Sequence, residues 1–224
     1  MKSPVPAIIL SSFFALLGSP VALSVIALPG SVGILQDADA SEWSKDMKEG
    51  ARLVAEGLDE QAFEKFALAS RSGELIAYHM LGVMHRDGRG TARDLVLAEE
   101  CFIKAASEGD SFAGQELALL RFAAPSDSEE FSTARAQLEK FAQEGKSRPQ
   151  LQLGIANLEG YGFTADAARA TKYLKSAASG DGHAKAEAAY LLGKLYRDGH
   201  KAPDVDSDME KAEFWLRIAA EKRH

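Results

Sequence analysis

The sequence predicts an all-α protein, a solenoid in which pairs of antiparallel helices stack one after another. Three observations predict it: a repeat of about 36 residues, apolar residues at helical spacing within each repeat, and glycines where the helices end. A single helical hairpin cannot bury its own apolar stripe. Neighbouring hairpins must therefore stack around one continuous core.

The first 40 residues are expected to lie outside this fold. Lys2 is followed by apolar runs at 5–17 and 21–28, and no further charge occurs before Asp37. One basic residue followed by a short apolar stretch is typical of a secretory signal. Small-x-small cleavage sites occur at 25–27 and 38–40.

Two alternatives to a cleaved signal stay open. Residues 5–35 are long enough for an uncleaved membrane anchor, although prolines and glycines interrupt them, and the segment could also be neither signal nor anchor. A cleaved signal would make the protein periplasmic or secreted, in a bacterium, and an anchor would hold it in the membrane, facing the periplasm.

Each repeat is predicted to contain two helices, which we call helix A and helix B. Helix A carries a Leu-Gly or Leu-Ala pair that recurs at 81–82, 117–118, 153–154 and 192–193. The small residue removes bulk where two helices must approach closely, which offsets the helix cost of glycine, about 1 kcal/mol.

A glycine-rich turn, such as 87–90 or 159–162, then leads to helix B. We expect helix B to begin at an acidic residue that caps its free N–H groups. These acids are Asp94, Glu130, Asp166 and Asp208. Each unit closes at a glycine: Gly73, Gly109, Gly145 or Gly180.

These anchors divide the chain into a leader and a repeat domain. The leader spans 1–40 and the repeat domain 41–224. The five predicted repeats lie at about 41–73, 74–109, 110–145, 146–181 and 182–224.

The pattern resembles the Sel-1-like repeat, a longer-looped relative of the tetratricopeptide repeat. Residues 74–109 match best, 146–181 and 185–224 match well, and 110–145 depart by carrying Ala118 and a turn without Gly-x-Gly. Residues 43–73 keep only the second helix convincingly. The resemblance implies a right-handed superhelix and protein–protein binding, as in adaptors, assembly factors and periplasmic regulators. The family also includes a cysteine-rich branch, stapled by disulfides, that is associated with binding penicillin-like ligands. A chain whose only cysteine is Cys101 cannot belong to that branch.

Composition narrows the possible partners. The formal net charge of −7 disfavours nucleic acid, which needs a clustered basic face. Cys101 is the only cysteine, so it is predicted to be a small apolar filler between helices.

No catalytic, metal or cofactor site is predicted. His79 and His85 are six residues apart, off the spacing of a helical metal pair, and no Gly-x-Ser-x-Gly elbow occurs. The acidic stretch 204–208 begins like a calcium loop, but Met209 stands where that loop needs glycine and Trp215 where it needs glutamate.

A partner is expected on the concave wall, which in tetratricopeptide-type superhelices is lined by helix A. Transferring the family's spacing around the small residue predicts a binding face. Its members are Ile76, His79, Arg86, Phe112, Gln115, Leu119, Phe122, Leu151, Ile155, Leu158, Tyr190, Lys194 and Arg197. An apolar stripe with charged ends suits an amphipathic helix or an extended peptide. The alternative is that tight curvature buries these residues against one another or against residues 28–42.

The sequence thus favours an exported, non-enzymatic scaffold, adaptor or regulator that binds another protein. The alternative is a cell-envelope enzyme or carbohydrate-binding accessory whose site the repeats do not reveal.

Overall fold

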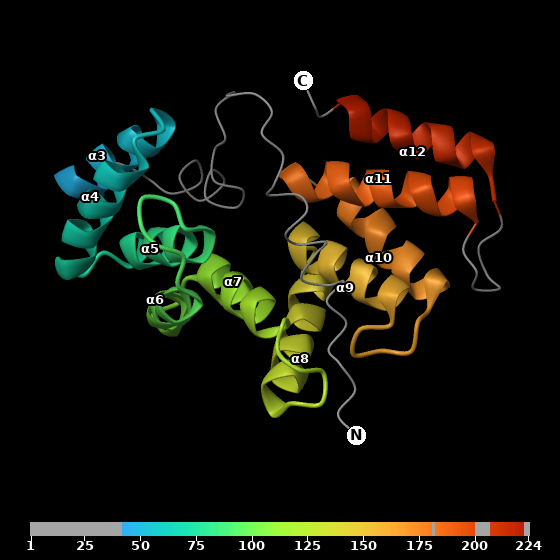
Figure 1. Ribbon diagram of the computed structural model, residues 1–224, viewed down its shortest axis with the longest axis horizontal. Coiled ribbons are helices and arrows are strands. Elements are labelled where there is room, and N and C mark those ends of the chain that lie inside the picture. Colours follow the sequence, from blue (N-terminus) through green and yellow to red (C-terminus); the bar gives the residue numbers. More distant parts are fainter. Residues whose placement is uncertain (1–41, 181, 200–206, 222–224) are drawn as a thin grey trace. The chain divides into compact units, whose positions relative to one another are not determined.

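The computed structural model describes residues 42–180, 182–199 and 207–221. These ranges contain ten α-helices that follow one another as antiparallel pairs (Figure 1), which confirms the all-α prediction. The helices are α3 (Lys45–Ala55), α4 (Asp59–Arg71), α5 (Leu75–Asp87), α6 (Leu95–Ser107), α7 (Ser111–Arg121), α8 (Glu129–Gln143), α9 (Ser147–Glu159), α10 (Ala167–Ser179), α11 (Gly182–Asp198) and α12 (Met209–Glu221). The predicted leader, residues 1–40, lies outside the described residues.

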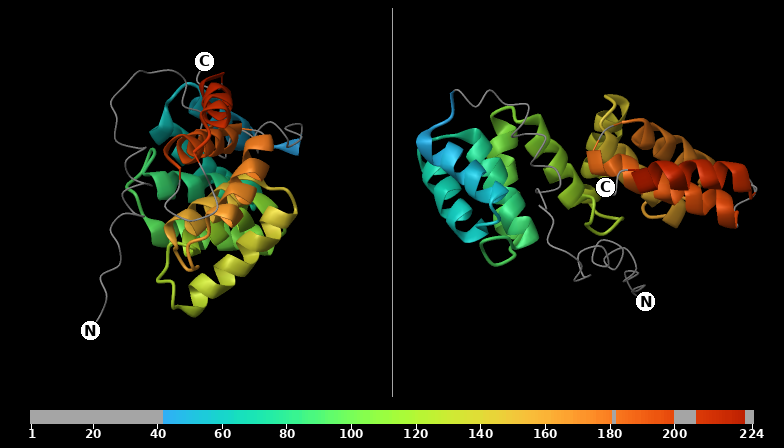
Figure 2. Two further views of the ribbon diagram at one scale, coloured as in Figure 1. Left: turned by 90° about the vertical axis from the view of Figure 1, so that its right-hand side faces the viewer. Right: turned by 90° about the horizontal axis from the view of Figure 1, so that it is seen from above.

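The chain divides into two compact units, each larger than one repeat, and the division lies inside α6. From here on, the first unit means residues 1–101 and the second unit means residues 102–224. In the second unit each helix packs against the next, from α7 to α12 (Figures 1 and 2). Helix α9 also contacts α7 and α11, its counterparts in the neighbouring repeats. The A helices of this unit therefore lie side by side.

Glycines of helix A lie where a side chain would collide with helix B. A Cβ added at Gly154 would lie 2.8 Å from Leu174, and one added at Gly193 would lie 2.6 Å from Leu216. No real Cβ makes contacts this short, so only glycine permits the observed approach. The predicted role of the Leu-Gly pair is confirmed here.

The turn after helix A begins alike in the repeats of α5 and α9, and one hydrogen bond across its end recurs in three repeats. Gly88 and Gly160 end α5 and α9 in the left-handed region, with φ of 68° and 74°. The N–H of the acid before helix B then donates to a carbonyl near the end of helix A. These bonds join Asp94 to His85 (2.9 Å), Asp166 to Asn157 (2.9 Å) and Asp208 to Tyr196 (2.8 Å).

Three of the four predicted helix B caps are confirmed. The carboxylates of Asp94, Asp166 and Asp208 accept N–H bonds from the first turns of α6, α10 and α12. The prediction for Glu130 is wrong: α8 starts at Glu129, and the Ser128 hydroxyl accepts the Phe131 N–H at 3.0 Å. A short hydroxyl side chain reaches this N–H group, and the longer glutamate lies within the first turn.

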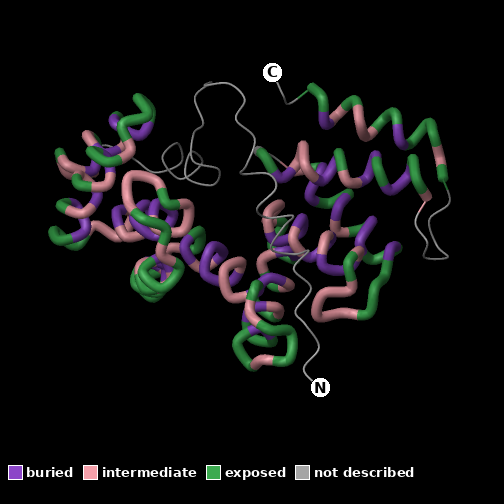
Figure 3. The backbone as a smooth tube through the Cα atoms, in the orientation of Figure 1, coloured by how far each residue is buried: buried purple, intermediate pink, exposed green. Residues whose placement is uncertain are grey.

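The core lies between the helices of each pair and between neighbouring pairs. Figure 3 shows buried residues on the sides that the helices turn toward one another. Cys101 is half-buried, and burial raises the pKa of its thiol to about 11. The thiol is therefore protonated at neutral pH, as expected for a packing residue.

Candidate functional site

Helices α7, α9 and α11 carry most of the predicted binding face. The repeat spacing places Leu119, Ile155 and Lys194 at equivalent positions on these adjacent helices. Leu119 and Ile155 are half-buried and Lys194 is exposed. Side chains of this face thus remain accessible and change from apolar to charged toward α11.

Four of the predicted face residues lie within the protein core. They are His79, Gln115, Phe122 and Leu151, each at most 8% exposed. Phe122 stacks on Phe131 with ring centroids 4.7 Å apart and meets Tyr161 edge-on. These four side chains offer no surface to a partner, because they are buried. They were predicted on the face because residue spacing alone does not distinguish the exposed side of a helix from the side that packs in the core.

The other nine predicted residues retain accessible surface. Ile76, Arg86, Leu119, Ile155 and Leu158 are half-buried, and Phe112, Tyr190, Lys194 and Arg197 are exposed. Whether they bind a partner stays a prediction.

Charged groups accompany this face in the second unit. Arg148 pairs with the buried Glu116, and Arg197 pairs with Asp198 at 2.6 Å. Burial raises the pKa of Glu187, although the charges of His183 and Arg148 oppose the shift. The Lys194 ammonium lies 5.9 Å from the centre of the Tyr190 ring, so α11 presents an aromatic and a basic group together.

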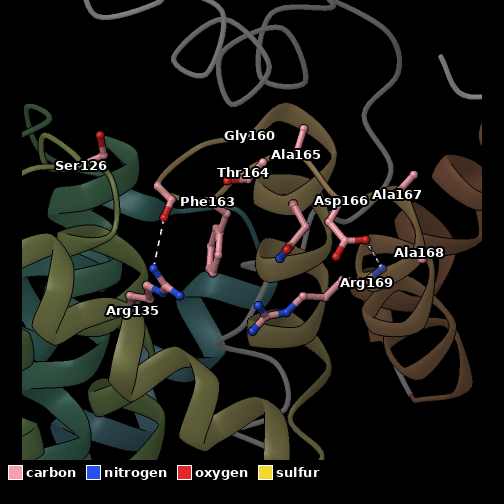
Figure 4. A pocket seen from close by; sticks show the side chains of 12 residues that line it. Ser126, Arg135, Gly160, Phe163, Thr164, Ala165, Asp166, Ala167, Ala168 and Arg169 are labelled. Atoms are coloured by element: carbon pink, nitrogen blue, oxygen red, sulfur yellow. Dashed lines mark hydrogen bonds between the residues drawn. The ribbon is translucent and has the colours of Figure 1, made fainter. Parts of the chain in front are cut away.

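A second feature of this unit is a groove of about 980 Å³ beside the loop that joins α9 to α10. Its walls include Arg135 of α8, Phe163 and Asp166 of the loop, and Arg169 of α10 (Figure 4). None of these residues belongs to the predicted face, and Asp166 was predicted only as a helix cap. The sequence carries no motif for this groove.

Two arginines flank the Phe163 ring in this groove, as Figure 4 shows. The guanidinium carbon of Arg135 lies 4.0 Å from the ring centroid and that of Arg169 lies 5.4 Å from it. Arg135 also donates to the Gly162 carbonyl at 3.1 Å, which fixes it against the loop. Glu139 pairs with both arginines, at 3.3 and 3.4 Å.

No group of three or more His, Cys, Asp or Glu side chains in the described ranges is placed to hold a metal ion. Asp204 to Asp206 of the calcium-like stretch lie outside those ranges, while Asp208 caps α12. Among the residues that the structure describes, none of the helices is both long and apolar enough to cross a membrane.

Both the fold and the sequence identify a class of helical-repeat protein. The model of the Sel1 repeat matches residues 75–110, 150–181 and 186–224, close to the best three of the predicted units. The chain is a Sel1-repeat protein. Residues 42–74 and 111–149 are not matched, yet they contain the helix pairs α3–α4 and α7–α8.

Solved structures agree with this assignment. A Sel1 repeat protein from Oxalobacter formigenes is 25% identical, with a TM-score of 0.62 over 88% of this chain and 80% of that chain. The predicted solenoid of helix pairs is therefore confirmed.

Weaker likenesses also occur. A protective antigen of uropathogenic Escherichia coli with an SLR fold is 23% identical (TM-score 0.49, 73% of this chain, 34% of that chain). An immunity protein from Pseudomonas aeruginosa is 16% identical (TM-score 0.44, 80% of this chain, 83% of that chain). No curated protein matches the chain in sequence.

Proposed function

We propose that this protein is an exported, non-enzymatic scaffold or adaptor that binds another protein through the helix A face of its second unit. One observation carries the proposal. Leu119 on α7 and Ile155 and Leu158 on α9 are apolar and half-buried. On α11, which contacts α9, the equivalent residues Lys194 and Arg197 are exposed, and Tyr190 is exposed beside them. Aromatic and arginine side chains with partly exposed apolar neighbours are the residues that dominate protein interfaces.

Two further points support it. Sel1 repeats commonly mediate protein binding, and the glycines and alanine pairs of this chain serve helix packing. The expected signal at residues 1–40 supports a location in the periplasm or outside the cell. Sequencing the N-terminus of the exported protein tests this part, and recovery of an intact Met1 would contradict cleavage.

Exposed residues test the binding face without damaging the core. Tyr190 is 49% exposed and Lys194 is exposed, so Tyr190→Ala and Lys194→Glu should leave the fold intact. Phe122 is unsuitable, since its ring is 1% exposed. Lys172→Glu is the matched control, because Lys172 is an exposed lysine on α10, outside the predicted face.

The experiment is affinity capture from an envelope extract with the mature protein and these three variants. We expect one protein to be captured by the unchanged chain and by Lys172→Glu, and at least tenfold less by Tyr190→Ala and Lys194→Glu. Equal capture by all four proteins would contradict the proposal that the helix A face binds the partner. Turnover of a cell-envelope substrate by the purified chain would overturn the scaffold.

A further inference from the structure

Helix α12 exposes a packing face that is buried on α10, the B helix of the preceding repeat. The caps Asp166 and Asp208 align the two helices at a spacing of 42 residues. Leu174 of α10 and Leu216 of α12 therefore hold the same position, and each packs on the glycine of its own helix A. Leu174 is fully buried, whereas Leu216 is only half-buried. The same leucine position is thus covered in one repeat and open in the next.

Three further positions of this face differ in the same way. The equivalent residues, with α10 first, are Ala167 and Met209, Thr171 and Glu213, and Ala178 and Ala220. On α10 all three are at most 9% exposed. On α12 all three are exposed, and Met209 is 67% exposed. We call Met209, Glu213, Leu216 and Ala220 the α12 stripe.

Helix α11 accounts for the burial on α10. It packs against α10, and Ala167, Leu174 and Ala178 form one apolar core with Ala188 and Leu195 of α11. Residues three and four apart lie on one side of a helix, so the α12 stripe is the same kind of helix-packing surface. In the part of the chain that the structure describes, no helix covers it, and the side of α12 turned away from α11 is largely exposed (Figure 3). The occupant that this surface fits is therefore another helix.

Helix α3, the first described helix, offers no matching apolar surface. Its exposed side carries Lys45, Lys48 and Arg52, which share one face by their spacing. A polar outer face of this kind keeps the end of a solenoid soluble. Joining α12 of one copy to α3 of the next would place these charged groups against Met209 and Leu216, which is unfavourable. A second copy would therefore meet α12 through its own α12.

The α12 stripe is complementary to itself when two copies run antiparallel, with the two-fold axis between residues 214 and 215. Met209 then lies opposite Ala220 of the second copy, so that a long side chain meets a small one. Glu213 lies beside Leu216 and Arg217 of the second copy. Glu213 and Arg217 already pair within one chain at 2.7 Å, and their side chains are 73% and 67% exposed. An exposed pair contributes little by itself, but two-fold symmetry brings two such pairs together as alternating charges that attract.

We propose that the protein forms a two-fold dimer in which α12 packs antiparallel against α12 of a second copy. The apolar residues of the α12 stripe form the centre of the contact, and Glu213 and Arg217 pair across it twice. One pair of helices buries less than the roughly 800 Å² per partner of a standard interface, so the dimer is reversible, with a Kd above about 1 μM. The dimer presents the helix A face twice, which strengthens binding to a repetitive partner.

Sedimentation velocity of the mature protein between about 1 and 300 μM tests the dimer, because weak interfaces associate in this range. We expect the mass to rise from one chain to two. Met209→Glu should weaken dimerisation at least tenfold, and an acid in the first turn of a helix does not destabilise it. Phe214→Glu is the matched control and should leave the dimer unchanged, because Phe214 is 55% exposed on the same helix but lies outside the α12 stripe.

Charge reversal tests the antiparallel pairing itself. Glu213→Arg leaves two basic groups beside the stripe and Arg217→Glu leaves two acidic groups, so each variant alone should dimerise at least tenfold more weakly. An equal mixture of the two variants should dimerise at least as tightly as the unchanged protein, because every charge pair across the contact then attracts. Circular dichroism establishes that each variant is folded.

Other results would overturn the dimer. A protein that stays a single chain at the highest concentration, or a dimer that Met209→Glu leaves intact, would show that the α12 stripe does not join two copies. Equal weakening by Phe214→Glu would place the contact elsewhere on α12, and a mixture that fails to recover would contradict the antiparallel pairing. Each of these results leaves the helix A face standing, because capture with Tyr190→Ala tests that face separately.

Discussion

Residues 88–94 in the first unit and 160–166 in the second occupy the same place in their repeats, between helix A and helix B. Both begin with a left-handed Gly-x-Gly pair, Gly88 and Gly90 or Gly160 and Gly162. In both, the second glycine touches the residue 31 positions earlier in the chain, Asp59 or Phe131.

The side chains around these two loops are chemically different. In the first unit Arg89 pairs with Asp59 at 2.6 Å. The equivalent residues of the second unit, Tyr161 and Phe131, meet edge to face with centroids 5.3 Å apart. Phe122 completes this cluster. The shared backbone therefore sets the position of the loop, while a charged pair or an aromatic cluster can secure it.

Removal of the Phe131 ring should lower the free energy of unfolding more than any other change at these two loops. Phe131→Ala deletes a ring that is 2% exposed, so we expect a loss of about 3–5 kcal/mol. Asp59→Ala breaks a partly exposed ion pair and should cost about 1 kcal/mol. Urea unfolding measures both.

The two tryptophans allow each unit to be followed separately. Trp43 lies in the first unit and Trp215 in the second, so a Trp43→Phe background reports on Phe131→Ala and a Trp215→Phe background on Asp59→Ala. Equal losses from the two substitutions would mean that the ion pair and the aromatic cluster contribute alike.

Alanine at the second glycine should be costly in both loops. A Cβ at Gly90 would lie 2.2 Å from the Asp59 carbonyl oxygen, and one at Gly162 would lie 2.1 Å from the Phe131 ring. Strain at positive φ and this collision together should cost more than about 2 kcal/mol in each case.

Gly109 is the control for that substitution. It has φ of 101° with open space around it, so Gly109→Ala should cost only about 1 kcal/mol. The same urea titrations measure all three variants. A cost at Gly90 no larger than at Gly109 would show that the loop can move away from α4.

The repeat spacing predicted the shared features of these loops but not their differences. Helical pairs, Gly-x-Gly turns and the caps Asp94, Asp166 and Asp208 all follow from local rules that recur in each repeat. Phe122 was misplaced on the binding face because its partners, Phe131 and Tyr161, come from two other segments. No spacing rule joins those three segments before the chain is folded.

The groove escaped sequence reasoning for a related reason. Arg135, Phe163 and Arg169 lie on α8, a loop and α10, and none is unusual alone. Only comparison of each with its counterpart in another repeat, once the contacts are known, shows that Phe63, Thr91 and Leu97 have been replaced together. A groove of this kind is a departure from the repeat, whereas periodicity reveals only what the repeats share.

The Tyr161 hydroxyl should make the second loop sensitive to high pH. It donates to the Ala124 carbonyl at 2.6 Å, and burial raises the pKa of the phenol. Its stabilisation is complete below the unfolded pKa of about 10 and is lost as pH rises through the higher folded value. Tyr161→Phe should cost about 1 kcal/mol at pH 7 and much less once the pH exceeds the folded pKa. Urea unfolding of the second unit across this range measures the change, and a cost independent of pH would contradict it.

The smallest expected difference between the two loops is in how the cost of a substitution, in free energy of unfolding, depends on salt. Screening at 1 M NaCl shortens the reach of charge interactions to about 3 Å, so the cost of Arg89→Met should fall by about 0.5 kcal/mol between 0.05 and 1 M. The aromatic cluster carries no net charge, and the cost of Phe131→Ala should stay constant or rise slightly. If Arg89→Met were insensitive to salt, its aliphatic stem rather than its charge would secure the first loop, and both loops would then depend on packing.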